Sequence, residues 1–342
     1  MEYTFRTVSA VSAPASRFVP PPGRVLHMAG QSEPQFGDYV RLVTEDGRAC
    51  PLPAGGAAYT SLTWDSFNPD SPDAKRECGE IPWLLARPWP LTLNLALWLG
   101  ADQLVPIARG EFDAALARLG TGIAAARRPV YLRPGYEFDH PGHAFPPDAF
   151  KAAWRRIVEV VRAHAAGGAA FVWHSFAWRP THEERDPIDW YPGDDLVDWI
   201  GVSIFTPAPK QLNARRLIEI ARERSKPVTI CECSGTRHGD RAALTGAALW
   251  DAWYEPLFAF IAEHPEVRAF SIINYDWDSS PGWKKLGWGD ARLHADPELL
   301  RLWRERMRQP AFLHGEPDLY RLLGWEGESA TSAWIAPSPG IG

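Results

Sequence analysis

Short apolar stretches recur along the chain, and segments with apolar residues at helical spacing follow most of them. The apolar stretches predict eight β-strands, which cover residues 24–31, 57–64, 91–98, 130–138, 170–176, 199–205, 227–232 and 267–275. The helical segments cover residues 111–127, 147–166, 211–225, 246–263 and 297–308. The predicted strands begin about 28 to 40 residues apart, which leaves room for a crossover helix between successive parallel strands.

Eight alternating units in one continuous span predict a parallel sheet that closes into a (β/α)8 barrel, an α/β TIM barrel. The alternative is an open, doubly wound sheet. No glycine-rich phosphate loop follows the first predicted strand, which argues against that alternative. We therefore expect one barrel domain over residues 24–327, with an irregular segment 1–23 before it and a tail 328–342 after it.

Two of the predicted strands run through apolar residues and then end in a glutamate. The stretch 130–139 carries Glu137 near its end, and the stretch 227–235 carries Glu232. Because side chains alternate between the two faces of a strand, Arg133 and Glu137 are expected to point the same way. Active sites of barrels lie at the carboxyl ends of the strands. We predict a site with Glu137 as general acid/base, Glu232 as nucleophile and Arg133 keeping Glu232 ionised. A structural acid paired with an arginine is the alternative for either glutamate alone.

Polar and aromatic residues at the strand ends and in nearby loops are expected to contact the ligand. Asp139 could bind a sugar hydroxyl, cap a turn or replace Glu137 as the acid. His174 could orient a carboxylate or contact the sugar, or its neighbours in the barrel could satisfy it. Trp98 and Trp277 could be stacking platforms or core residues. The full set of expected substrate-binding residues is Gln31, Trp98, Arg133, Tyr136, Asp139, His174, Trp178, Phe205, Tyr275 and Trp277.

Composition and charge exclude several classes of partner. The net charge is -6, and lysine and arginine are spread along the chain, so we expect neither a nucleic acid nor an anionic membrane as partner. No stretch approaches the length of a membrane span. No signal peptide is visible at the start. The sequence therefore does not decide whether the protein is cytoplasmic or is secreted with its leader removed. A monomer is expected.

The cysteines do not form a zinc pattern, and we expect neither a metal nor an organic cofactor. Cys231 and Cys233 flank Glu232 and are therefore expected to face away from it, towards the covering helices. Cys50 and Cys78 could pair, which the sequence leaves open.

Two motifs resemble glycoside hydrolase family 26, the β-mannanase family. Leu-Arg-Pro-Gly-Tyr-Glu-Phe-Asp over residues 132–139 resembles its fourth-strand motif, and residues 191–201, Tyr-Pro-Gly-Asp-Asp-Leu-Val-Asp-Trp-Ile-Gly, are similar to its approach to the sixth strand. The strand ends at Glu232 and Trp277 resemble the wider clan of retaining barrel glycosidases. The likeness runs in order over about residues 25–310.

The resemblance implies that Glu137 is the acid/base, that Glu232 is the nucleophile and that Arg133 supports the site. Tyr136 is a departure, since the family usually has histidine before the acid/base and the wider clan often has asparagine. The residue at that position normally helps to hold the sugar or the nucleophile. The resemblance therefore does not establish mannan as the substrate.

We expect a glycoside hydrolase, of a type that includes the endo-β-mannanases, that cleaves a β-linked polysaccharide or oligosaccharide with retention. Retention requires roughly 5–5.5 Å between the two carboxyl groups. One alternative is a carbohydrate-binding barrel without catalysis, which the departure at Tyr136 keeps open. Another is a metal-dependent barrel hydrolase, which lacks the expected ligands at the strand ends.

Overall fold

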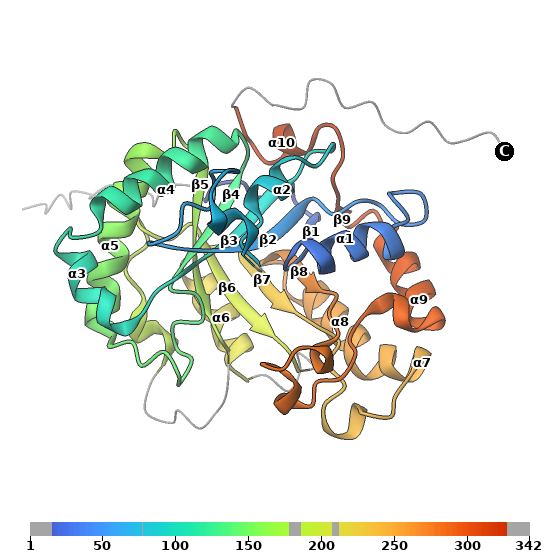
Figure 1. Cartoon of the computed structure of the whole chain (residues 1–342). Helices are drawn as coiled ribbons and strands as arrows, with labels where there is room; N and C mark the ends of the chain where they lie inside the picture. Colours follow the sequence, from blue (N-terminus) through green and yellow to red (C-terminus); the bar gives the residue numbers. More distant parts are fainter. Residues whose placement is uncertain (1–15, 77, 178–185, 207–211, 327–342) are drawn as a thin grey trace, which may run out of the picture.

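Eight parallel strands form a closed barrel surrounded by helices, as the alternation of apolar stretches predicts (Figure 1). The computed structural model describes residues 16–76, 78–177, 186–206 and 212–326. Around the barrel the strands follow the order of the chain, and β1 pairs with both β8 and β2, which closes the ring. The strands are β1 Val25–Gly30, β2 Gly55–Ser61, β3 Thr92–Trp98, β4 Val130–Pro134, β5 Ala169–Ser175, β6 Trp199–Ile204, β7 Val228–Cys233 and β8 Val267–Ile273.

A ninth strand, β9 Phe312–Leu313, pairs in parallel with the first residues of β1. It is too short to leave a periodic signal in the sequence. The expected N-terminal segment is described from residue 16 onwards, and the expected tail 328–342 lies outside the described residues.

The helices cover the outer face of the barrel. They are α1 Glu33–Asp38, α2 Ile81–Leu85, α3 Leu104–Ala108, α4 Asp113–Ala126, α5 Pro147–His164, α6 Leu212–Glu223, α7 Gly246–Leu249, α8 Glu255–Glu263 and α9 Pro297–Met307. A further helix, α10 Leu319–Leu322, packs instead with the inward-facing residues of the strands. The predicted helix 246–263 is divided into α7, a π-helical turn Trp250–Tyr254 and α8. Pro256 stands at the start of α8 and has no amide proton for a bond one turn back, which explains the break.

Alternating side chains of the strands build two apolar layers. Outward residues pack against the helices, where Trp154 and Ile157 of α5 are fully buried at the predicted spacing. Inward residues such as Met28, Tyr131 and Val172 fill the barrel below its mouth. The polar functional groups therefore lie above a packed floor, at the carboxyl ends of the strands. Among the described helices, none combines the length and the apolar character that crossing a bilayer requires.

A buried chain of hydrogen bonds joins β1 to the helices outside it. His314 Nε2 lies 2.8 Å from the Met307 carbonyl oxygen, which only accepts, so Nε2 carries the proton and Nδ1 accepts. His27 Nδ1 then donates to His314 Nδ1 over 3.1 Å, and His27 Nε2 accepts from the Tyr39 hydroxyl over 2.8 Å. Trp303 donates to the same hydroxyl. This series of hydrogen bonds is complete only while both histidines are neutral.

Protonation of these histidines should destabilise the fold in acid. Burial lowers the pKa of His314 to about 4 and places the pKa of His27 well below its ordinary value of 6.5. The unfolded chain then binds more protons than the folded chain, so the free energy of unfolding should fall as the pH drops from about 6.5 towards 4.

Chemical denaturation across this pH range checks the expectation. His314→Gln should reduce the pH dependence of the unfolding free energy, whereas the exposed His164→Gln should leave it unchanged. An unaltered pH dependence in His314→Gln would show that this network is not its source.

Candidate active site

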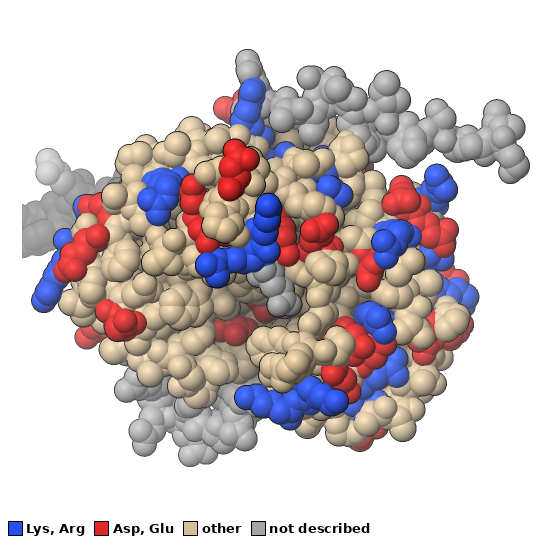
Figure 2. Space-filling view, in the orientation of Figure 1, with Lys and Arg blue, Asp and Glu red and all other residues tan. Residues whose placement is uncertain are grey.

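A cavity of about 910 Å³ opens at the carboxyl ends of the strands and contains both predicted glutamates. The sequence-predicted residues in its wall are Gln31, Tyr136, Glu137, Phe205, Glu232 and Trp277. Residues that the sequence analysis did not single out complete much of the remaining wall, among them Tyr59, His140, His143, Thr206, Thr236, His238, Trp283 and Trp288. The face of the protein in Figure 2 carries basic and acidic side chains interspersed over its surface.

Glu232 reaches the cavity because β7 contains a bulge. Ile230 pairs with Val202 and Glu232 pairs with the next residue of β6, so Cys231 is an extra residue in the ladder. Cys231 packs inside the barrel with Val172, and the expectation that it faces the helices is wrong. The bulge lets two consecutive side chains turn inward, which strict alternation does not allow.

The other three cysteines are Cys233, Cys50 and Cys78. Cys233 packs in the outer layer, as predicted. No disulfide joins Cys50 to Cys78. Within the described parts of the chain, no group of three or more histidine, cysteine or acidic side chains could hold a metal ion.

Glu137 reaches the cavity from a turn and not from a strand, which corrects the expectation based on alternation. β4 ends at Pro134, four residues earlier than predicted, and Gly135 and Glu137 both have positive φ, +53° and +55°. A left-handed conformation at a non-glycine residue is uncommon and clusters at functional sites. The Glu137 carbonyl oxygen accepts from His143 Nδ1 over 2.9 Å, and the Glu137 carboxyl Oε1 accepts from the Ser203 hydroxyl over 2.5 Å.

Arg133 lies fully buried beneath the two glutamates and forms an ion pair with Glu232. Its Nη1 donates to Glu232 Oε1 over 2.6 Å. The aromatic faces of Tyr59 and Tyr136 lie 5.5 and 5.7 Å from the guanidinium carbon, within the range of cation–π attraction. Burial lowers the pKa of Arg133, but the charge of Glu232, its hydrogen bond to Arg133 and the neighbouring Tyr59 and Cys231 together outweigh burial, so the pKa is raised. Arg133 therefore stays charged and neutralises Glu232.

Tyr59 provides a second donor to Glu232. Its hydroxyl lies 2.7 Å from Glu232 Oε1 and 3.0 Å from the side-chain amide of Gln31. A hydroxyl has one proton, and the charged carboxylate is the stronger acceptor. Tyr59 is not recognisable as a site residue from the sequence, because the predicted second strand extends to residue 64, whereas β2 ends at Ser61. Tyr59 was therefore treated as part of the strand body and not as a residue of the mouth.

The two carboxyl groups lie in different electrostatic environments. Burial and the nearby charge of Glu232 raise the pKa of Glu137 from 4.5 to about 8, although the Ser203 hydrogen bond and Arg133 oppose the rise. Glu232 instead has a buried guanidinium and a phenol hydroxyl as donors. One group is thus suited to hold a proton at neutral pH, and the other to carry a negative charge.

Two other predicted residues support the site from outside the cavity wall. His174 is fully buried below the mouth, with its ring nitrogens beside Arg133 and Ser203. Asp139 caps the turn after β5, where it accepts from the hydroxyl of Ser175 and from the amide of Phe176, each over 2.6 Å. The capping role was one of the alternatives for Asp139.

The remaining predicted aromatic residues lie apart from the cavity wall. Trp98 is 49% exposed at the end of β3 and does not line the cavity. Tyr275 packs edge-on against Trp277 with ring centres 5.0 Å apart, also outside the lining. Trp178 lies outside the described residues.

An aromatic wall closes the side of the cavity next to β6 and β8. Trp277 is almost fully buried and donates its indole proton to Ser234, so it forms a fixed wall. Phe205 stacks on Trp288 with ring centres 4.8 Å apart, and the partly exposed Trp283 lies nearly parallel to Trp288. The sequence analysis missed Trp283 and Trp288 because their loop has no periodic pattern that would place them.

Removing the buried cation should destabilise the protein. Arg133→Met leaves the Glu232 carboxylate without its partner in a desolvated position, so we expect a loss of about 3–5 kcal/mol in the free energy of unfolding. Urea denaturation at neutral pH measures this loss. The matched control is Arg301→Met, whose ion pairs on α9 are exposed, and little change is expected there. Equal stability of the two variants would contradict the assigned role of Arg133.

Comparison with known proteins gives relatives of named activity. No family model matches the sequence. The chain is 29% identical over 336 residues to the β-1,3-xylanase TXYA of a Vibrio species, covering 90% of this chain and 70% of the relative. It is 28% identical over 338 residues to a β-1,3-xylanase of an Alcaligenes species, covering 90% of this chain and 68% of the relative.

The fold is similar to solved structures of glycoside hydrolase family 26. A modular endo-β-1,4-mannanase from Cellulomonas fimi matches with a TM-score of 0.56 and 17% identity, over 86% of this chain and 73% of that chain. GH26C from Muricauda sp. MAR_2010_75 matches with a TM-score of 0.58 and 12% identity, over 90% of each chain. These comparisons confirm the resemblance found in the sequence: the chain is a glycoside hydrolase, and its (β/α)8 barrel is similar to those of family 26.

Proposed function

We propose that this glycosidase hydrolyses a β-1,3-linked xylan with retention of configuration, with Glu137 as general acid/base and Glu232 as nucleophile. Two curated relatives that align over 90% of the chain are named β-1,3-xylanases. The endo-β-1,4-mannanase from Cellulomonas fimi shares the fold at 17% identity, so it carries less weight for the choice of sugar. The observation that carries the residue assignment is the contrast between a proton-holding Glu137 and an arginine-paired Glu232 in one cavity.

In the first step, a carboxylate oxygen of Glu232 forms a bond to the anomeric carbon, and the glycosidic C–O bond breaks. Glu137 gives its proton to the departing oxygen, which leaves as a neutral hydroxyl. Arg133 and Tyr59 both donate to Oε1 of Glu232. We therefore assign the attack to the second oxygen, Oε2, whose lone pairs these donors do not occupy.

In the second step, water replaces Glu232 at the anomeric carbon. Glu137, now a carboxylate, takes a proton from the water as its oxygen attacks, and the glycosyl ester bond breaks. Glu232 leaves as a carboxylate and regains its ion pair with Arg133. The negative charge thus returns to the position that the buried cation stabilises.

The aromatic wall fits a sugar chain that lies across the mouth. Pyranose rings stack on indole faces, and Trp283 is 45% exposed beside the cavity. Tyr136 stands above Arg133 in the wall, at the position where the resemblance indicates a different residue. We infer that this departure accompanies the change from mannan to xylan.

Removing either carboxyl group should abolish most of the hydrolysis of β-1,3-xylan. Glu137→Ala should lower kcat/KM by about 10²–10⁴-fold, the usual contribution of a general acid/base, and Glu232→Ala should lower it at least as much. Reducing-sugar assays on β-1,3-xylan, β-1,4-xylan and β-1,4-mannan measure the effect and the preference. Glu298→Ala, an exposed glutamate on α9, is the control.

Three results would redirect this proposal. Turnover that survives both alanine variants would end the residue assignment. Turnover of mannan in preference to β-1,3-xylan would move the substrate to the sugar of the solved relatives. Binding of xylan by the wild-type protein without hydrolysis would favour the non-catalytic carbohydrate-binding barrel.

The stereochemistry of the product tests the double displacement directly. Hydrolysis of a β-linked substrate followed by proton NMR should show the β-anomer first, with the α-anomer growing in later through mutarotation. Initial formation of the α-anomer would indicate inversion and a wider separation of the carboxyl groups, ~6.5–9.5 Å.

A further inference from the structure

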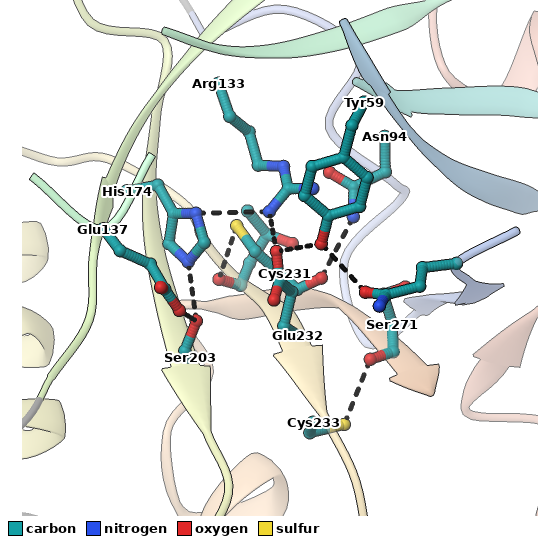
Figure 3. A network of polar contacts seen from close by, with 12 residues as sticks. Tyr59, Asn94, Arg133, Glu137, His174, Ser203, Cys231, Glu232, Cys233 and Ser271 are labelled. Carbon is teal, nitrogen blue, oxygen red and sulfur yellow. Dashed lines mark hydrogen bonds and ion pairs between the residues drawn. The ribbon is translucent and has the colours of Figure 1, made fainter. Parts of the chain in front are cut away.

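Three buried polar side chains connect the two glutamates across neighbouring strands (Figure 3). Arg133 on β4, His174 on β5 and Ser203 on β6 are each fully buried. Arg133 Nη1 lies 2.6 Å from Glu232 Oε1 and 3.2 Å from His174 Nδ1. His174 Nε2 lies 3.0 Å from Ser203 Oγ, which lies 2.5 Å from Glu137 Oε1.

The chemistry of these groups fixes the direction of each hydrogen bond. A guanidinium only donates, so His174 Nδ1 must accept from Arg133. Burial and the charge of Arg133 lower the pKa of His174 well below its ordinary value, so the ring is neutral and carries its proton on Nε2. Nε2 then donates to Ser203 Oγ. The hydroxyl proton of Ser203 is left to point at Glu137.

We propose that Ser203, oriented by His174, is a positioning residue that holds the Glu137 carboxyl and stabilises the carboxylate that forms when Glu137 has given up its proton. This inference rests on the proposed role of Glu137 as acid/base. It assigns a function to two buried side chains that reach the reaction only through another residue. Arg133 thereby acts on both glutamates, directly on Glu232 and through two hydrogen-bonded groups on Glu137.

Ser203 differs from the charged groups around Glu137 because it is neutral at every relevant pH. The titratable or charged groups that face Glu137 or its loop are Glu232, Arg133, Asp139, Tyr136, His143 and His174. Changing Glu232, Arg133 or Asp139 would alter the local charge as well as the contacts. Removing the Ser203 hydroxyl leaves the charges in place and removes its hydrogen bonds to His174 and Glu137. The bond to Glu137 favours the charged form of that carboxyl. Its loss should therefore raise the pKa of Glu137.

The pH dependence of kcat/KM on β-1,3-xylan measures this effect. In the wild-type enzyme, activity should fall as the pH rises through about 8, where Glu137 loses its proton. Ser203→Ala should move this basic limb upward by about one to two pH units, the value of a hydrogen bond to a charged group. Ser203→Thr keeps the hydroxyl and should leave the limb near its wild-type position. A basic limb that does not move in Ser203→Ala would overturn the inference.

Variants of His174 show whether this residue orients the Ser203 hydroxyl or only packs against it. His174→Leu removes the donor that directs Ser203, so it should move the basic limb upward by less than Ser203→Ala. His174→Gln keeps an acceptor for Arg133 and a donor for Ser203 and should restore the limb. The double variant Ser203→Ala/His174→Leu should shift the limb no further than Ser203→Ala alone, because both act through one bond. Additive shifts would contradict the proposal that His174 acts on Glu137 through the Ser203 hydrogen bond.

A measurement without turnover distinguishes failure of this inference from failure of the proposed function. The pKa of Glu137 is raised in the folded protein from 4.5 to about 8, so its contribution to stability is present below about 4.5 and is lost as the pH rises through about 8. Glu137→Gln should abolish this part of the pH dependence of Tm. Ser203→Ala should extend the loss to higher pH than in the wild-type protein.

The two failures then look different. Full activity of Glu137→Ala would end the proposed function, while the Tm series would still report on Ser203. An active wild-type enzyme whose Ser203→Ala variant titrates unchanged in both kcat/KM and Tm would end only the present inference.

Discussion

The buried ion pair between Arg133 and Glu232 is the interaction on which the rest of the site depends. A guanidinium that is fully removed from water is tolerated only beside a compensating negative charge. Arg133 and Glu232 therefore fix each other's position and charge. The same Nη1 group touches His174, so the ion pair also determines which nitrogen of that ring carries the proton. The charge distribution of the whole mouth follows from this one contact.

The barrel makes this contact possible because inward positions of neighbouring parallel strands lie at similar heights. Arg133, His174 and Ser203 occupy such positions on β4, β5 and β6. The two glutamates need local departures from regular strand geometry, a bulge before Glu232 and a left-handed turn at Glu137. Regular strands supply the supporting groups, and irregular backbone supplies the two glutamates that we propose as the reacting groups.

The sequence was sufficient to predict the fold and to bring Glu137 and Glu232 to one cavity, because both predictions depend on local patterns. Apolar periodicity located the eight strands, and an acid at the end of an apolar stretch marked Glu137 and Glu232. The route by which Glu137 reaches the cavity was predicted wrongly, because alternation ignores the turn after Pro134. The inward side chain of Cys231 was missed for a similar reason, since a bulge leaves no signal in one sequence. Ser203 was missed because serine in an apolar strand is common and becomes informative only when its neighbours on β4 and β5 are known.

The solved relatives share the barrel at low identity, whereas the curated relatives share nearly a third of the residues over most of the chain. The most direct test of the account is to identify the residue that becomes bound to the sugar. A 2-deoxy-2-fluoro-β-xylobioside with a β-1,3 linkage and a good leaving group should trap the enzyme, and peptide mass spectrometry should place the label on Glu232. A label on any other residue, or turnover of the reagent without a covalent adduct, would contradict the double displacement at this ion pair.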